Sequence, residues 1–213
     1  MELVKKSMLK AGSITLLILL VGLLAGLQAD DMRTDFIQQQ LEESSLRSQT
    51  FVVTEKYLSE SSKNYCEVVS RQIPDIAEKN AQIGRDLQSF SSKSVSNRAR
   101  YKLLKEEYYV NQLRLYNTIQ GYNKRCNAST TTIFFFFDES IQSQRQGTVL
   151  TEYREEVDNE TYIFSYNLDT KNSTVMEILK QDFNVTDGPT VVVNGNRTFR
   201  EYVSLKRLRS VIE

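Results

Sequence analysis

Hydrophobic positions recur along the chain in three different patterns. An uninterrupted apolar run comes first. Apolar residues at helical spacings of three, four and seven follow it, and short apolar runs that alternate with helical stretches come last. Together these patterns predict an α+β protein. Its parts are an N-terminal membrane helix (1–29), a long α-helical hairpin region (30–126) and a C-terminal βαβαββα domain (127–213).

The first run, Ala11–Leu27, has about 17 residues, close to the shortest helix that spans a bilayer. Charged residues flank it on both sides: Lys5, Lys6 and Lys10 before it, Asp30 and Asp31 after it. Because lysine-rich flanks stay in the cytoplasm, we expect a single-pass cell-membrane protein with a cytoplasmic N-terminus and an outer C-terminal domain. A cleaved signal peptide is the alternative, although Leu27 is large for a cleavage site after Ala29.

The middle part predicts three helices, from residue 30 to the low 60s, over 65–87 and over 101–122. Pro74 is expected to start or kink the second helix, and a polar break at 91–97 precedes the third. We expect the helices to pack on each other as a hairpin. The alternative is that their apolar stripes dock an unidentified protein partner or a second copy of the chain, forming a homo-oligomer.

The last part predicts four strands and three helices. The strands are 130–137, 161–167, 190–193 and 197–202, and the helices are 143–157, 174–183 and 205–212. Thr174 and Glu177 form a T-x-x-E capping box, and the helix after them is expected to bury Ile178 among other apolar residues. Asn194-Gly195 predicts a tight hairpin turn between the last two strands. Two right-handed β-α-β crossovers followed by a hairpin imply a mixed sheet.

Composition removes several classes of function. Lys plus Arg and Asp plus Glu both number 27, so the formal net charge is zero and no nucleic-acid partner is expected. The chain has no His, which excludes histidine bases, histidine metal ligands and a Ser-His-Asp triad. Its two cysteines cannot form a four-ligand zinc site alone. We therefore expect no metal, no cofactor and no catalytic residue.

Short motifs in the last part resemble those of a known family. Gly188-Pro189-Thr190 stands immediately before the third predicted strand, and Gln146-Gly147 and Phe164–Asp169 lie earlier. With the βαβαββα order, these motifs resemble membrane-anchored archaeal thioredoxin-like proteins, which carry an anchor helix, a helical hairpin and a thioredoxin-like domain. The resemblance implies that Pro189 occupies the position of the cis-proline of thioredoxin-like proteins.

The chain departs from this family at the redox motif. Ser140-Ile141-Gln142-Ser143 occupies the C-x-x-C position. Disulfide exchange needs a thiolate, whereas a serine hydroxyl stays protonated and forms no mixed disulfide. Ser140 and Ser143 are expected to cap the helix that follows them. A serine nucleophile is the alternative, but the chain offers no His to activate it.

Cys66 and Cys126 flank the second and third predicted helices. In an antiparallel hairpin the two positions meet, and thiols outside the cytoplasm tend to oxidise. We expect an intrachain disulfide with the two Cα atoms within about 7 Å of each other. Two free thiols, or a bridge between two chains, are the alternatives.

Five N-x-S/T sequons follow the helical region. Their asparagines are Asn127, Asn159, Asn172, Asn184 and Asn196. This number exceeds what the composition predicts, so the five are candidate glycosylation sites on an outer surface. A chance excess is the alternative.

These observations favour one function and leave two others open. The favoured function is a redox-inactive, non-catalytic protein-binding or assembly module that keeps a peptide-binding edge beside Pro189. The first alternative is a thiol-disulfide oxidoreductase, or an accessory to one, that works through Cys66 and Cys126. The second alternative is a structural spacer of the cell envelope.

Overall fold

The computed structural model describes residues 46, 50, 53, 54, 56–58, 60, 64–89, 95–156 and 161–212. The chain divides into two compact units, Met1–Lys63 and Asn64–Glu213. The described residues of the first unit are helical, and the second unit contains the sheet. None of the described helices is long and apolar enough to cross a membrane. The predicted anchor at 1–29 lies outside the described residues and stays a prediction.

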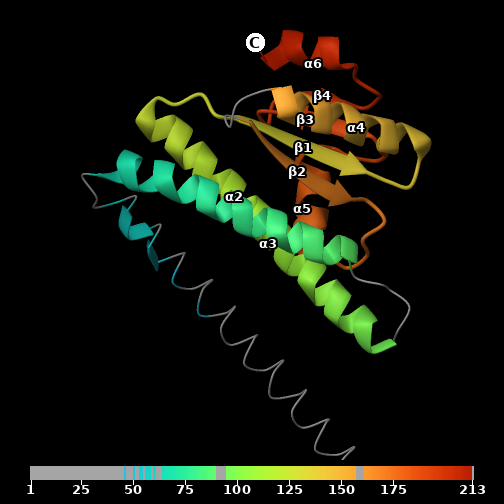
Figure 1. Cartoon of the computed structure of the whole chain (residues 1–213), viewed down its shortest axis with the longest axis horizontal. Coiled ribbons are helices and arrows are strands. Elements are labelled where there is room, and N and C mark those ends of the chain that lie inside the picture. Colours follow the sequence, from blue (N-terminus) through green and yellow to red (C-terminus); the bar gives the residue numbers. More distant parts are fainter. Residues whose placement is uncertain are drawn as a thin grey trace, which may run out of the picture. The chain divides into compact units, whose positions relative to one another are not determined.

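Four strands form one mixed sheet with the order β2-β1-β3-β4 (Figure 1). The strands are β1 (Thr131–Phe137), β2 (Thr161–Asn167), β3 (Thr190–Val193) and β4 (Arg197–Phe199). β1 pairs with β2 in parallel and with β3 antiparallel, and β3 pairs with β4 antiparallel. The predicted strands are confirmed, except that the first begins at Thr131 and not at Thr130, and the fourth ends at Phe199 and not at Tyr202.

The second connection in the sheet is not the parallel crossover that the sequence predicted. Thr190 pairs with Phe136, so β3 begins at the end of the sheet where β2 stops. The connecting helix, α5 (Thr174–Asp182), has 9 residues, and β1 has 7. A helix of this length spans about 13 Å, against about 23 Å for the strand, so it does not carry the chain back to the start of β1. β3 therefore runs antiparallel to β1.

β1 is buried on both of its faces, so each face needs a covering layer. On one side, α4 (Ile141–Glu156) and α6 (Leu205–Ile212) supply that layer. The buried residues of this core come from both helices, from β1 and β3 and from the segment before α6: Ile133, Phe135, Leu150, Tyr153, Val191, Val193, Val203 and Leu208. Alternate residues of β1 point to this side, as the period of a strand requires.

The opposite face of the sheet carries an aromatic cluster. α3 (Val95–Cys126) places the ring centroid of Tyr116 4.6 Å from that of Phe134. Phe183, at the end of α5, adds a second contact, with its centroid 4.9 Å from that of Phe134. α3 is therefore a covering helix of the sheet as well as one arm of the helical hairpin. The sequence pattern did not predict this second role.

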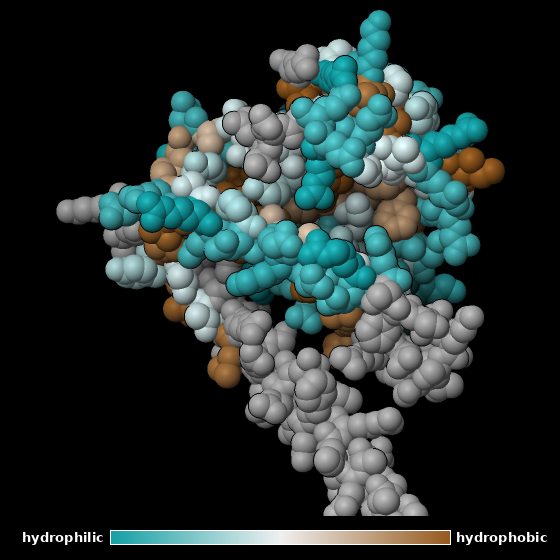
Figure 2. Space-filling model, in the orientation of Figure 1, coloured by the Kyte–Doolittle hydropathy of each residue, from teal (hydrophilic) through white to brown (hydrophobic). Residues whose placement is uncertain are grey.

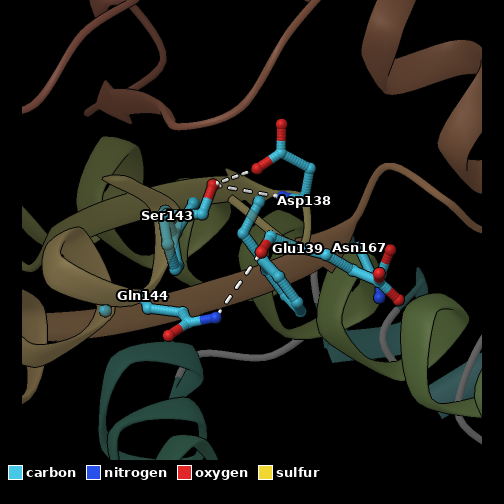
Figure 3. Close-up of a pocket in the computed structure, with 8 residues that line it drawn as sticks. Asp138, Glu139, Ser143, Gln144 and Asn167 are labelled. Carbon is cyan, nitrogen blue, oxygen red and sulfur yellow. Dashed lines mark hydrogen bonds between the residues drawn. The ribbon is translucent and has the colours of Figure 1, made fainter. Parts of the chain in front are cut away.

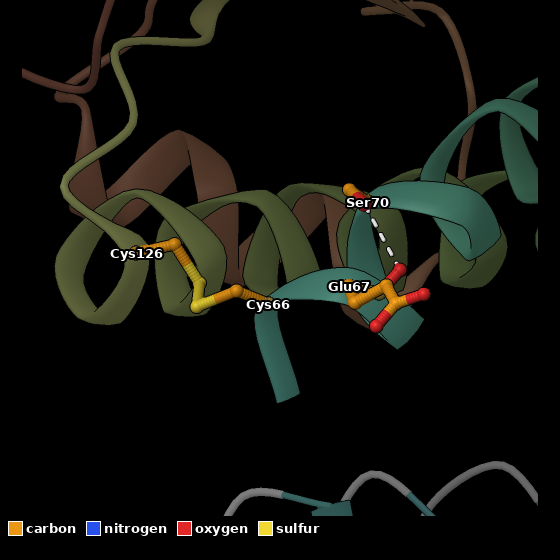
Figure 4. Close-up of a disulfide and its surroundings, with 4 residues drawn as sticks. All are labelled: Cys66, Glu67, Ser70 and Cys126. Atoms are coloured by element: carbon orange, nitrogen blue, oxygen red, sulfur yellow. Dashed lines mark hydrogen bonds between the residues drawn. A yellow bond between two sulfur atoms is a disulfide. The ribbon is translucent and has the colours of Figure 1, made fainter. Parts of the chain in front are cut away.

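α2 (Tyr65–Ser89) and α3 form the predicted hairpin and lie side by side (Figure 1). Cys66, near the start of α2, is bonded to Cys126, at the end of α3, with Cα atoms 5.6 Å apart (Figure 4). The predicted intrachain disulfide is therefore confirmed. Cys66 is exposed, so reductants in solution can reach the bond.

Side-chain hydrogen bonds attach α3 to the sheet near both ends of the strands. Next to the start of β1, the Asn123 side chain donates to the Thr130 carbonyl (2.8 Å) and accepts from the Thr130 N–H (3.1 Å). At the end of β2, Tyr109 Oη accepts from the Asn167 N–H and bonds to Thr170 Oγ1, each at 3.0 Å. α3 thus satisfies backbone groups that the strands leave unpaired.

These contacts place residues 64–126 in the same compact unit as the sheet. The boundary that the sequence predicted at residue 126 falls inside this unit. Near residue 126 the chain changes from helix to strand. Tyr116 of the hairpin and Phe134 of the sheet, which lie on either side of this position in the sequence, belong to the same aromatic cluster.

Two helix starts differ from their predicted positions, and Pro74 does not start α2. α4 begins at Ile141 and not at residue 143, because the Gln144 N–H already bonds to the Ser140 carbonyl (3.1 Å). α3 begins at Val95, inside the predicted polar break. α2 does not start at Pro74 but runs through it, and Pro74 lies on the exposed side of the helix.

The predicted capping box at the start of α5 is wrong. The N-cap is Ser173, whose Oγ accepts from the Met176 N–H (3.2 Å), so Thr174 is the first helical residue. The inward face of α5 is shifted accordingly. Met176 is buried there, whereas Ile178, which was expected to be buried, is 53% exposed.

Removal of the disulfide is expected to lower the free energy of unfolding by about 4 kcal/mol, since the bond closes a loop with a sequence separation of 60. A Cys66→Ser/Cys126→Ser variant should therefore melt at a lower temperature than the wild-type chain, as measured by circular dichroism. Reductant is the matched control, because it should lower the melting temperature of the wild type only. Equal melting temperatures without reductant would contradict this prediction.

Candidate functional site

The junction between β1 and α4 holds the two serines of the C-x-x-C position. Ser140 Oγ accepts a hydrogen bond from the Ser143 N–H (3.2 Å), and the Ser140 carbonyl accepts from the Gln144 N–H (3.1 Å). Ser140 therefore caps α4, as predicted. Ser143 was also expected to cap the helix, but its side chain is 2% exposed and turns back toward the end of β1.

Asp138, directly after β1, joins the two serines in what we call the Asp138 network (Asp138, Ser140 and Ser143). Figure 3 shows the side chains of Asp138 and Ser143. Ser143 Oγ donates to Asp138 Oδ1 (2.6 Å) and accepts from the Asp138 N–H (3.2 Å). The same carboxylate oxygen accepts from the Ser140 N–H (3.0 Å). Asp138 was not predicted as a site residue. The sequence feature that could have indicated it is its position between a buried strand and the residue that caps the next helix.

The Asp138 network holds a fixed negative charge. Hydrogen bonds from Ser140 and then from Ser143 lower the pKa of the Asp138 carboxyl group from 3.8 to about 2. The carboxylate also interacts favourably with the positive N-terminal end of α4. A charged oxygen network thus occupies the place where the resemblance predicts redox-active thiols.

The loop before β3 packs directly on this network. Gly188–Pro189 is a cis peptide bond, as predicted. A Cβ atom on Gly188 would lie 2.8 Å from the Asp138 backbone nitrogen and 3.0 Å from Ser143 Oγ, so a side chain does not fit there. Thr190 Oγ1 donates to the Asp187 carbonyl (2.7 Å). The fold therefore brings the two predicted site groups, the serines and Gly188–Thr190, into contact.

An open hollow of about 580 Å³ lies beside the Asp138 network, against α4 and the ends of β1 and β2 (Figure 3). We call it the Gly147 hollow. Its lining residues are Phe135, Phe137, Asp138, Glu139, Ser143, Gln144, Gly147 and Asn167. The lining residues include two acids, Asp138 and Glu139, and two phenylalanines with stacked rings, and none of them is Lys or Arg.

The carboxylate beside Ser143 is a weak base. A serine nucleophile requires a base, and the carboxylate that bonds to Ser143 has a pKa of about 2, too low for proton abstraction at neutral pH. In the part of the chain that the structure describes, no group of three or more His, Cys, Asp or Glu could hold a metal ion.

The disulfide and the Asp138 network lie at opposite ends of β1. Cys126 comes shortly before the strand, and Asp138 directly follows it. A strand of 7 residues separates the two regions by about 23 Å. The cysteine pair therefore does not take part in the site at the start of α4.

Four of the five sequon asparagines are exposed: Asn127, Asn172, Asn184 and Asn196. Asn159 lies outside the described residues. Asn127, Asn172 and Asn184 have positive φ angles of 51°, 60° and 50°. Asparagine adopts this left-handed conformation more readily than most residues, so backbone geometry explains its presence at these three positions. The sequons remain candidate glycosylation sites.

The sequence matches no known protein family and no curated protein. Among solved structures, the chain is similar to one described as a malarial protein and to thioredoxin-2, described as a component of the malaria parasite protein secretion machinery. Each match has 24% identity and a TM-score of 0.34 and covers 39% of this chain, with 93% and 81% of the two other chains covered. A likeness at this level assigns no function to this chain.

Asp138→Asn should lower the free energy of unfolding by about 1 kcal/mol at pH 7, because hydrogen bonds to a charged acceptor are stronger than those to a neutral one. The pKa in the folded protein, about 2, is below its ordinary value of 3.8, so the carboxylate stabilises the fold above about pH 4. That stabilisation is lost as the pH falls toward 2. The difference in the free energy of unfolding between Asp138→Asn and the wild type should therefore become smaller at low pH.

Urea unfolding between pH 2 and pH 7 measures the effect of Asp138→Asn. Asp75→Asn, at an exposed position of α2, is the matched control and should change stability by less than about 0.5 kcal/mol. A deficit in Asp138→Asn that is the same at every pH would contradict the role of the charge.

Proposed function

We propose that this chain is a redox-inactive protein-binding or assembly module held at the outer face of the cell membrane by an N-terminal helix. The Asp138 network carries the proposal. At the C-x-x-C position the Ser143 hydroxyl is 2% exposed and lies 2.6 Å from a carboxylate oxygen. Since disulfide exchange needs an accessible thiolate, the module acts by binding and not by exchange.

The proposed binding edge consists of the Gly188–Pro189 loop and the start of α4. Gly188 is partly exposed, so an extended segment of a partner can approach the loop there. Ile141, in the first turn of α4, is 69% exposed and adds an apolar contact. On the face drawn in Figure 2, apolar side chains are scattered among hydrophilic ones.

Two observations support the proposed location. The apolar run Ala11–Leu27, flanked by lysines on one side, supports a membrane anchor. The Cys66–Cys126 disulfide supports an outer location for the compact unit, because disulfides persist in oxidising compartments and are rare in the cytosol.

A photoreactive amino acid at Ile141 should crosslink a partner protein in intact membranes, because Ile141 lies at the proposed binding edge. Ile178 is the matched control: it is also an exposed isoleucine, but it lies on α5, on the other side of the sheet. Mass spectrometry of the crosslinked products measures both. Equal crosslinking from the two positions would contradict the assigned edge, and none from either would favour a structural spacer.

The wild-type chain should reduce insulin no faster than the Cys66→Ser/Cys126→Ser variant. Ser140→Cys/Ser143→Cys should form a dithiol that oxidises reversibly, measured by thiol alkylation and mass spectrometry, with each single cysteine variant as its control. Failure of the two new thiols to pair would show that these serines do not occupy the redox-motif position. Insulin reduction that depends on Cys66 and Cys126 would favour the oxidoreductase alternative.

A further inference from the structure

A disulfide and one helix face attach α2 to the rest of its compact unit. α2 packs mainly against α3, and the disulfide joins the first turn of α2 to the last turn of α3 (Figure 4). The ion pairs Arg71–Glu67 and Arg85–Glu78 lie within α2 and do not add to this attachment. The position of α2 therefore depends on the disulfide and on the side chains that it buries against α3.

The buried side chains of α2 are concentrated beside the disulfide. Tyr65, Val69 and Ile73, in the first three turns, are at most 9% exposed. In the rest of the helix, Asn80 is the one buried side chain among the described residues, and its Nδ2 atom has no hydrogen-bond partner. A buried polar group without a partner opposes packing. The second half of α2 is therefore held weakly on α3.

α3 is held on the sheet by contacts that do not involve α2. The ring of Tyr116 lies against that of Phe134, and the side chain of Asn123 exchanges two hydrogen bonds with the backbone of Thr130. α3 can therefore stay in place when α2 leaves it. An isolated helix of the length of α2 is marginal in water, so a released α2 frays.

The disulfide is open to reduction from solution. Cys66 is exposed, whereas Cys126 is half-buried, so an external dithiol attacks Cys66 Sγ through its thiolate. The S–S bond breaks, a mixed disulfide forms at Cys66, and the Cys126 thiolate leaves and takes up a proton. The second thiolate of the dithiol then displaces Cys66. The chain gains two thiols, and the dithiol becomes a disulfide.

We propose that the Cys66–Cys126 bond is a redox switch, which holds α2 on α3 when it is closed and releases α2 when a dithiol reduces it. In the closed state the start of α2 is fixed beside Cys126, shortly before β1. In the open state α2 swings about its far end. Its start then lies up to about 37 Å from that end in any direction, since the helix has 25 residues.

The consequence of this switch rests on the proposed function. Residues 1–63 contain the proposed membrane anchor, and α2 connects them to α3 and the sheet. Release of α2 lengthens this connection, so the binding edge reaches further from the membrane. The chain is a substrate of disulfide exchange in this step and not its catalyst, which agrees with a redox-inactive module.

Limited trypsin digestion of the full-length chain in neutral detergent micelles tests the release of α2. The chain is digested untreated, or after reduction with dithiothreitol and alkylation, and mass spectrometry measures cleavage after Arg71 and Lys79 of α2 and after Arg145 and Arg154 of α4, all exposed. Reduction should raise the ratio of cleavage in α2 to cleavage in α4 about tenfold, because α2 opens by itself. Equal acceleration in both helices would overturn the proposal, since the bond would then only stabilise the whole unit.

The Cys66→Ser/Cys126→Ser variant controls for the alkyl groups. Without any treatment it should show the high ratio of the reduced wild type, and treatment should not change it. A ratio as low as that of the oxidised wild type would overturn the proposal.

Asn80→Leu should hold α2 on α3 after reduction, because an apolar side chain replaces a buried amide that lacks a partner. The cleavage ratio of the reduced variant should be about threefold lower than that of the reduced wild type. Gln82→Leu, at an exposed position of the same helix, is the matched control and should leave the ratio unchanged. Equal ratios in the two reduced variants would contradict the weak contact at Asn80.

Energy transfer in phosphatidylcholine vesicles separates failure of this inference from failure of the proposed function. The donor is a coumarin amino acid in place of Ile178, which is exposed on α5, and the acceptor is a trace of rhodamine-labelled lipid. Reduction should lower the transfer. Unchanged transfer in a chain whose α2 is released would overturn the longer reach. Absence of transfer in both states would refute the location at the membrane, and the trypsin ratio would still decide the switch.

Discussion

The burial of β1 on both faces is the constraint on which the rest of the structure depends. Phe135 belongs to the core beneath α4 and α6, and its neighbour Phe134 belongs to the aromatic cluster beneath α3 and α5. A strand with large apolar side chains on both faces needs a helical layer on each of them. The segment after β1 supplies the second face with α5 alone, a helix of 9 residues, so α3 completes the cover.

This requirement gives the helical hairpin a place in the core of the compact unit. α3 contacts the sheet through Tyr116 and through the paired hydrogen bonds between Asn123 and Thr130. α2 is attached to α3 by the Cys66–Cys126 bond. The hairpin and the sheet therefore belong to one compact unit, and residue 126 lies inside it.

Two glycines show how the site combines a closed part and an open part. At Gly188 a side chain is excluded, because the Asp138 nitrogen would lie 2.8 Å from its Cβ atom. At Gly147 a side chain is tolerated, and its absence leaves space beside Phe135. The closed part accommodates a hydroxyl oxygen at residue 143 and not a sulfur atom. The 2.6 Å between Ser143 Oγ and Asp138 Oδ1 is a normal O–H···O distance and is too short for a hydrogen bond from a thiol.

Local sequence patterns were sufficient for the positions of the strands, the hairpin turn at Asn194-Gly195, the cysteine pair and the cap at Ser140. The strands, the turn and the cap follow from residue type within a few positions, and the cysteine pair, although 60 positions apart, follows from the predicted antiparallel packing of the two helices between its members. The direction of β3, the second buried face of α3 and the place of Asp138 against Gly188 depend on residues that are about 18 to 60 positions apart. The spacing of apolar residues along the sequence does not indicate which distant side chain fills a given space. These features are therefore decided only when the layers pack together.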